Sequence, residues 1–195
     1  MALAVTLPLA LTACEDHSPV AAPTSTLPAQ DPADDSSSET DKPSIPEYDT
    51  ELDLNDEEKE AVEGALVAFE GFVSSIDSAY SGDFDQIAKF PEFARGDALV
   101  SIQEEAESVR SGATDFEGHI EPISVDVFDV SAPGNSKESS SVILHFCVDT
   151  SNWSMTPAGN SPTSNPDGKV TMEHQILLED ETWKVDQQDL WERKC

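Results

Sequence analysis

The chain has 195 residues, of which 40 are acidic and 10 are basic, so its formal charge is -30 at pH 7. A length of this order predicts one folded domain with room for flexible tails. The charge argues against a nucleic-acid-binding protein, because phosphate contacts need Lys and Arg. It argues equally against electrostatic attachment to anionic lipids, so any membrane attachment should be hydrophobic or covalent.

The N-terminus carries a short apolar segment. Residues 2–13 read ALAVTLPLALTA, and a run of about 12 residues is too short to span a bilayer, which takes roughly 20. Its length is typical of the hydrophobic region of a signal peptide, so we predict a signal peptide over residues 1–13. The alternative is a buried N-terminal helix with Cys14 in the core, although such a helix should show caps and polar punctuation.

The apolar run ends in LTAC at residues 11–14, and charged residues follow at once. This sequence resembles the lipobox of bacterial lipoproteins, which is a Leu, two small residues and a Cys. The resemblance implies that Cys14 is acylated, with palmitate for example, and anchors an extracytoplasmic protein to the cell membrane. Lipoproteins carry Lys or Arg before the apolar run, whereas the first basic residue here is Lys42. A true start upstream of Met1 would explain this difference.

Residues 14–55 are expected to form a tether that begins at the lipidated cysteine. The segment is rich in Ser, Thr, Pro, Asp and Ala, as in PAQDPADDSSSETDKPS at residues 28–44. Such a composition cannot bury enough apolar surface to offset the entropy of ordering, so we predict disorder. Its prolines and mutually repelling carboxylates should keep it extended as a spacer.

Helical periodicity begins at residue 56. Acidic residues at 56–58 suit the first turn of a helix, and apolar residues then recur at helical spacing up to Tyr80. This pattern predicts one amphipathic helix of about 24 residues. A short helical turn is expected over residues 84–90. Pro91 is well placed to open a second long helix, whose apolar stripe continues to Gly112.

After Gly118 the apolar period changes to two, which predicts four strands. They cover residues 123–130, 142–148, 170–178 and 183–191. A phase shift at Phe128 is typical of a bulge, and residues 179–182 should form a tight hairpin. Helices followed by strands predict an α+β domain over residues 56–195, with N-terminal helices packed on a curved four-stranded antiparallel sheet.

This region resembles the NTF2-like, or SnoaL-like, cone domains found in many lipoproteins of Gram-positive bacteria. The resemblance rests on the long opening helix, on the order of helices and strands, and on ETWKV at residues 181–185. The last segment is similar to the W-[KR]-[VI] pattern of the closing strands in that family. The resemblance implies a cone around a pocket, from which the family's enzymes use His, Asp or Tyr as general acid or base.

Two histidines, His145 and His174, lie on neighbouring predicted strands. Matching the apolar faces of these strands pairs Val142 with Ile176, Leu144 with His174 and Phe146 with Met172. His145 then points to the opposite face, because successive side chains of a strand alternate. His174 can line the pocket, although a lone histidine on an apolar face is more often a satisfied core residue.

Residues 150–168 show no clear periodicity. Loops of this length are usually functional or disordered, and an exposed Trp153 and Met155 would offer a contact surface to a partner. The alternative is a loose connection whose Trp153 folds back on the sheet. The sequence contains no CxxC, HExxH, GxSxG or phosphate-binding glycine loop, and we expect neither a metal site nor a cofactor.

The chain has three cysteines. Lipidation of Cys14 leaves Cys147 and Cys195, in a compartment where thiols can oxidise. We therefore predict a disulfide between these two, which would hold the C-terminus on the second strand. The alternative is a buried free thiol at Cys147 and a free Cys195.

These features predict a lipid-anchored envelope protein whose domain binds a small apolar ligand or an envelope protein without catalysing a reaction. His174, Trp153 and Met155 are the candidate binding residues. The rival hypothesis is a small cone-type enzyme that acts on an apolar metabolite, with His174 as base. It requires a cavity of roughly 300 Å³ or more and a second polar group within hydrogen-bond reach of His174.

Overall fold

A computed structural model describes residues 45–132, 140–162 and 168–195 of the chain. The helical elements are α1 (Asp56–Tyr80), the 3-10 helix η1 (Phe84–Lys89), α2 (Phe90–Phe93) and α3 (Gly96–Arg110). The strands are β1 (Thr114–Gly118), β2 (Pro122–Ser131), β3 (Ser141–Asp149), β4 (Trp153–Pro157), β5 (Lys169–Glu179) and β6 (Thr182–Glu192). The expected signal peptide, Cys14 and tether residues 15–44 lie outside the described residues.

Helix α1 forms as its sequence predicts. A capping box opens it: the Asn55 side chain accepts a hydrogen bond from the Glu58 backbone N–H at 3.0 Å, and the Glu58 carboxylate accepts one from the Asn55 N–H at 2.8 Å. These bonds satisfy backbone donors that have no partner within the helix. The apolar face of α1 is buried against the sheet, with Leu66 and Phe69 fully enclosed.

The second helical prediction is wrong in one respect, because the helix that Pro91 opens lasts a single turn. Ala94 is extended and forms a bridge to Val185 of β6, and the Arg95 N–H donates to the Val185 carbonyl at 2.9 Å. Gly96, at φ +53°, then starts α3 in a new direction. Pairing of this short segment with the edge strand β6 is a tertiary interaction, and helical periodicity in the sequence does not indicate it.

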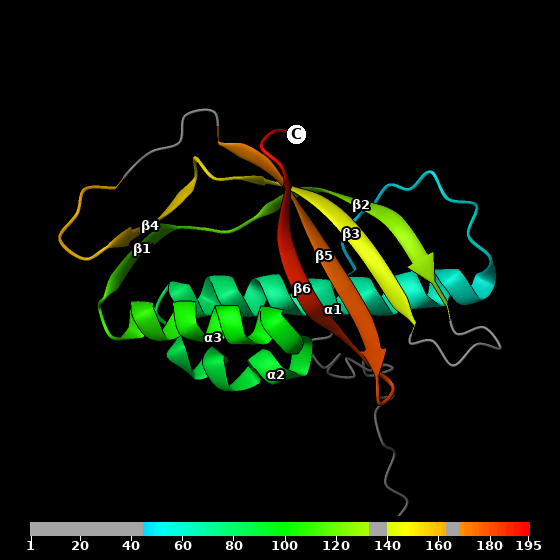
Figure 1. Cartoon of the computed structure of the whole chain (residues 1–195), viewed down its shortest axis with the longest axis horizontal. Coiled ribbons are helices and arrows are strands. Elements are labelled where there is room, and N and C mark those ends of the chain that lie inside the picture. Colours follow the sequence, from blue (N-terminus) through cyan, green and yellow to red (C-terminus); the bar gives the residue numbers. More distant parts are fainter. Residues whose placement is uncertain (1–44, 133–139, 163–167) are drawn as a thin grey trace, which may run out of the picture. The chain divides into compact units, whose positions relative to one another are not determined.

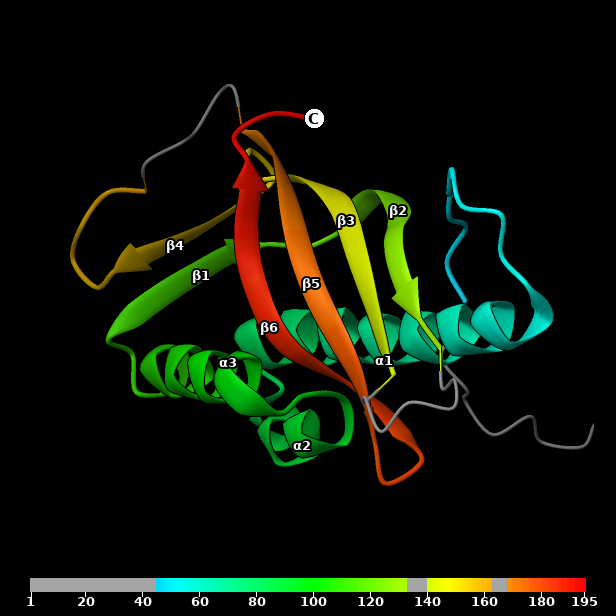
Figure 2. The same cartoon turned by 45° about the vertical axis from the view of Figure 1, so that its right-hand side comes forward.

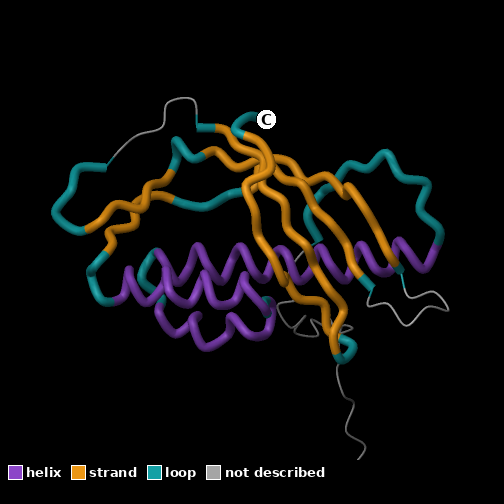
Figure 3. Tube along the Cα trace, viewed as in Figure 1, coloured by secondary structure: helices purple, strands orange, loops and turns teal. Residues whose placement is uncertain are grey.

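The main sheet has the order β2-β3-β5-β6 and all its neighbours are antiparallel. Figures 1 and 2 show it curving over α1, with the helices on one face, and Figure 3 shows the helices and the strands as separate layers. The predicted α+β class and the curved four-stranded sheet are therefore confirmed. The expected register is also confirmed: Val142 pairs with Ile176, Leu144 with His174 and Phe146 with Met172.

One bulge and one hairpin of the sheet also match their predictions. The register of β2 against β3 shifts between Val127 and Asp129, which confirms a bulge at Phe128. The hairpin between β5 and β6 turns through Asp180 and Glu181, whose φ angles are 47° and 65°. Successive positive φ angles are those of a tight hairpin turn.

A second, two-stranded sheet was not predicted. Strand β4 lies within the segment expected to be irregular, and it pairs with β1, which places Phe116 opposite Met155 and Gly118 opposite Trp153 (Figures 1 and 2). Gly118 has φ +96°, and a side chain there would overlap the backbone of Asn152. The pairing thus depends on one glycine and not on an apolar alternation.

The N-terminal boundary of the domain also lies earlier than predicted. Asp49 pairs with the edge strand β2: its N–H donates to the Val125 carbonyl, and its carbonyl accepts from the Val127 N–H, both at 2.9 Å. The Thr50 hydroxyl adds a bond of 2.8 Å to the Val127 carbonyl, and Tyr48 packs against the core. Unpaired backbone groups of an edge strand favour such pairing, so Tyr48, Asp49 and Thr50, which the sequence assigned to the tether, make contacts with the domain.

No helix among the described residues is long and apolar enough to cross a membrane.

Candidate ligand-binding cavity

A cavity of about 670 Å³ lies on the helix-facing side of the sheet. Helices α1 and α3 form one side, strands β3, β5 and β6 form the other, and β4 contributes to the wall as well. This volume falls in the usual range of about 300–1,000 Å³ for small-molecule sites. The cavity lies on the face of the sheet where the family resemblance implied a pocket.

The cavity wall is mainly apolar. Its apolar side chains come from helices, from both sheets and from the segment before β2: Phe72, Val73, Ile76, Ile102, Ile120, Phe146, Val148, Trp153, Met155, Val170 and Met172. Most belong to the same apolar cluster as the core. Apolar ligand surface would lose contact with water here, which is favourable at about 25 cal/mol per Å².

His174 of β5 lines the cavity, and its side chain is almost fully enclosed, with 2% of the residue exposed. Its ring meets three phenylalanines edge to face, with centroid separations of 5.7 Å to Phe69, 5.2 Å to Phe72 and 4.6 Å to Phe146. Burial lowers the pKa of His174 from 6.5 to about 3, so the ring is neutral at physiological pH. Its Nδ1 atom is buried and has no hydrogen-bond partner within the described part of the chain.

Trp153 and Met155 are two residues apart on β4 and both line the cavity. Of the two alternatives for this segment, an exposed contact surface or a Trp153 that folds back, the structure has the inward arrangement: both residues are half-buried and pack against the core. Pairing of β4 with β1 holds them there, and Phe116 of β1 lies beside Trp153 with ring centroids 6.2 Å apart. The indole N–H of Trp153 is buried without a hydrogen-bond partner among the described residues.

Two elements, α3 and β6, each bring three polar side chains to the cavity. They are Asp97, Ser101 and Glu105 of α3, and Gln187, Gln188 and Asp189 of β6. Gln188 is the cross-strand neighbour of His174. The sequence pattern did not single out this set, although residues 97, 101 and 105 are spaced by about one helical turn and therefore share a face of α3.

Tyr80 connects the end of α1 to this polar set. Its hydroxyl donates a hydrogen bond of 2.6 Å to Glu105. Burial, and then the negative charge of Glu105 and this bond, raise the pKa of Tyr80. The phenol therefore stays protonated and keeps Glu105 oriented at the cavity.

Arg95 fixes the start of α3 to the sheet. Its guanidinium forms ion pairs with Asp186 of β6 at 2.8 Å and with Glu179 of β5 at 2.7 Å. Gly96 follows directly, and a side chain there would meet Asp186. These contacts set the position of Asp97, the first residue of α3 that lines the cavity.

His145 lies on the other face of the sheet, as predicted. It stacks on Phe128 with centroids 4.3 Å apart, lies 4.6 Å from the Trp191 ring, and its Nε2 is 2.8 Å from the Glu173 carboxylate. The two histidines of the neighbouring strands are therefore not brought together.

The two requirements of the enzyme hypothesis have different outcomes. The cavity exceeds the required volume, but no hydrogen bond within the described ranges joins Nδ1 of His174 to a second polar group. Nor do the described residues include a group of three or more His, Cys, Asp or Glu side chains that could hold a metal ion. Catalysis with His174 as base stays the rival hypothesis.

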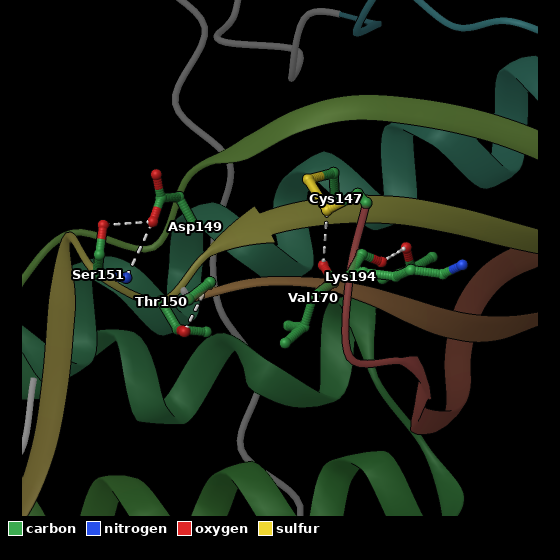
Figure 4. The surroundings of a disulfide bond; sticks show 9 residues. Cys147, Asp149, Thr150, Ser151, Val170 and Lys194 are labelled. Carbon is green, nitrogen blue, oxygen red and sulfur yellow. Dashed lines mark hydrogen bonds between the residues drawn. A yellow bond between two sulfur atoms is a disulfide. The ribbon is translucent and has the colours of Figure 1, made fainter. Parts of the chain in front are cut away.

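The predicted disulfide between Cys147 and Cys195 is confirmed, with a Cα–Cα distance of 5.8 Å (Figure 4). The C-terminal residues cross β5 to reach β3. On the way the Thr171 hydroxyl donates to the Lys194 carbonyl at 2.8 Å, and the Cys195 sulfur lies 3.3 Å from the Val170 carbonyl oxygen. The disulfide thus fastens β6 across β5 at the end of the sheet where Val170 and Val148 line the cavity.

No protein-family model matches this chain, and no curated protein matches it. A solved structure that it resembles is the intermembrane space region of chloroplast protein ARC6. The TM-score is 0.46 at 13% sequence identity, over 64% of this chain and 92% of that one. Similarity of this degree identifies neither a family nor a function.

Proposed function

We propose that this protein is a lipid-anchored envelope protein whose domain binds a small, largely apolar molecule without catalysing a reaction. The observation that carries the proposal is the cavity of about 670 Å³ between the helices and the sheet. Its wall is apolar, while His174 and Trp153 each present a buried nitrogen without a partner among the described residues. Apolar walls with a few convergent polar groups are the usual composition of a small-molecule site.

The domain is, in this proposal, a variant of the NTF2-like cone. Long helices packed on the inner face of a curved antiparallel sheet, with a cavity between them, support this assignment. The closing strand β6 carries the Trp183-Lys184-Val185 segment on which the resemblance rests.

The anchor is a further part of the proposal, which places acyl chains on Cys14 and the domain outside the cytoplasm. The LTAC sequence supports it. The disulfide between Cys147 and Cys195 supports the location as well, because such bonds persist in oxidising compartments and are rare in the cytosol.

Binding can be tested with an uncharged apolar fluorophore, 1-N-phenylnaphthylamine, whose emission rises when it leaves water. Val170→Phe replaces a small aliphatic side chain of the cavity wall with a phenyl ring, on a strand where aromatic residues are well tolerated. Ile123→Phe is the matched control, because Ile123 is exposed on β2 and does not line the cavity. We expect saturable binding to the wild type and to Ile123→Phe, and at least tenfold weaker binding to Val170→Phe. Equal binding by the two variants would place the dye outside the cavity.

A further inference from the structure

The charge of the cavity lining restricts the ligand further than its apolar wall does. Three of the lining residues are carboxylates, Asp97 and Glu105 on α3 and Asp189 on β6, and all three are exposed. None of the described residues that line the cavity is Lys or Arg. Exposed lining residues belong to the part of the cavity that meets solvent, so a ligand enters past negative charge.

Two of the residues that line the cavity also carry a buried polar atom, which favours a ligand with a polar group. The indole N–H of Trp153 and Nδ1 of the 98%-buried His174 have no partner within the described ranges of the chain. A buried polar group without a hydrogen bond is unfavourable, and a hydrocarbon ligand would leave both atoms unpaired. A hydroxyl group in the apolar body of a ligand could bond to either atom, and a carbonyl group could accept a hydrogen bond from the indole N–H.

Resting on the proposed function, we infer that the cavity selects cationic amphiphiles. The apolar body of such a ligand packs against Phe72, Phe146 and Met172, and its ammonium group lies among Asp97, Glu105 and Asp189. Anionic amphiphiles of the same length, such as fatty acids, are rejected by the same carboxylates. Charge at the opening thus provides the specificity that an apolar wall alone lacks.

The test compares three amphiphiles that share a decyl chain, each below its critical micelle concentration. They are decyltrimethylammonium, decyl glucoside and decyl sulfate, and each competes with 1-N-phenylnaphthylamine for the full chain. We expect the Kd of the ammonium probe to be about tenfold below that of the glucoside, because an exposed carboxylate contributes a few-fold in affinity. The Kd of the sulfate should lie at least tenfold above that of the glucoside, and both differences should shrink in high salt.

A matched pair of variants separates local charge from the overall charge of -30. The first variant combines Asp97→Asn, Glu105→Gln and Asp189→Asn, and it keeps an amide oxygen to accept the Tyr80 hydrogen bond. The second combines Glu60→Gln, Glu63→Gln and Glu104→Gln, three exposed sites that do not line the cavity. Both variants have the same net charge.

We expect the differences between the three Kd values to be lost only in the cavity variant. Thermal melting should confirm that both variants fold. If all probes bind the wild type with equal Kd, or if both variants lose the order alike, the inference is overturned while apolar binding stands. If decyl glucoside does not displace the dye at all, the proposed function itself fails.

Discussion

At the scale of single residues, His174 is a position where the residue that would give the most stable fold differs from the residue that is present. A phenylalanine would extend the ring cluster of Phe69, Phe72 and Phe146, whereas the histidine brings a buried nitrogen without a partner among the described residues. Such an atom costs about 1–3 kcal/mol of folding free energy. Departures of this kind from the best packing concentrate at functional sites.

The depressed pKa of His174 predicts a pH effect on stability. Since its pKa is about 3 in the folded chain and 6.5 in the unfolded one, only the unfolded chain takes up this proton between those values. Stability is therefore highest above pH 6.5 and falls on acidification by up to about 1.4 kcal/mol per pH unit from this residue. His174→Phe should remove that part of the slope.

Urea denaturation of both proteins at several pH values between 7 and 4 provides the measurement. The carboxylates contribute to the slope of both proteins, so the difference between the two curves isolates His174. Parallel curves would show that the folded chain protonates this ring as easily as the unfolded one.

A second prediction at this scale concerns Gly64 of α1. A methyl group there would overlap the ring of Trp183 on β6. Gly→Ala within an exposed helix stabilises by up to about 1 kcal/mol, but overpacking costs about 1–3 kcal/mol, so we expect Gly64→Ala to be destabilising overall. Ser74→Ala, at an exposed position of the same helix, should be neutral or stabilising in the same thermal melts. A stabilised Gly64→Ala protein would mean that Trp183 does not pack on this glycine.

At the scale of elements, strong periodicity made much of the fold predictable from the sequence. The 25 residues of α1 and the four strands of the main sheet carry long apolar patterns, and matching those patterns set the register around His174 correctly. Strand β1 could not be found this way, because TDFEG has a single large apolar residue and its pairing depends on the φ angle of Gly118.

The candidate site was predictable only in part. Sheet register identified His174, whereas the position of Trp153 depends on pairing between β4 and β1, which lie far apart in the sequence. In the sequence, the acidic residues of α3 look like those of any solvent-exposed helix face. That Asp97 and Glu105 line the cavity depends on the position of α3 against β6, which the ion pair between Arg95 and Asp186 holds.

The disulfide provides a prediction at this scale. It closes a loop with a sequence separation of 48 residues, and the chain-entropy model gives a stabilisation of about 4 kcal/mol for a loop of that length. We expect Cys195→Ser to lower the free energy of unfolding by up to this amount. The exposed site of Cys195 makes serine a mild replacement there.

Chemical reduction of the wild type gives an independent check on that value. The reduced protein should unfold at the same urea concentration as Cys195→Ser, and reductant should not alter the variant. If reductant leaves the wild type unchanged, the bond contributes no stability.

At the scale of the whole molecule, the folded part begins before α1. Asp49 and Thr50 extend the edge of β2, so residues 45–55 stabilise the sheet as well as lead into it. A chain starting at Ile45 should therefore be more stable than one starting at Asn55, by about 1–3 kcal/mol from lost hydrogen bonds and the packing of Tyr48. Equal stability of the two chains would show that these residues do not stabilise the domain.

The proposed anchor is tested on the same scale. Cys14→Ser should abolish labelling of the protein by radioactive palmitate and release it from the membrane fraction, because stable attachment needs acyl chains. The wild type should be labelled and should resist carbonate washing. Membrane attachment without label in the wild type would contradict the lipid anchor.

The central claim, that the cavity binds an apolar molecule, can be tested most directly through the methionines. Met155 and Met172 both line the cavity, whereas Met1, the third methionine of the chain, belongs to the expected signal peptide. Carbon-13 labelling of the two methyl groups therefore gives two NMR reporters inside the cavity. We predict that titration with decyl glucoside shifts the signals of Met155 and Met172 along one saturable curve. If neither signal moves, no ligand has entered the cavity and the account is contradicted.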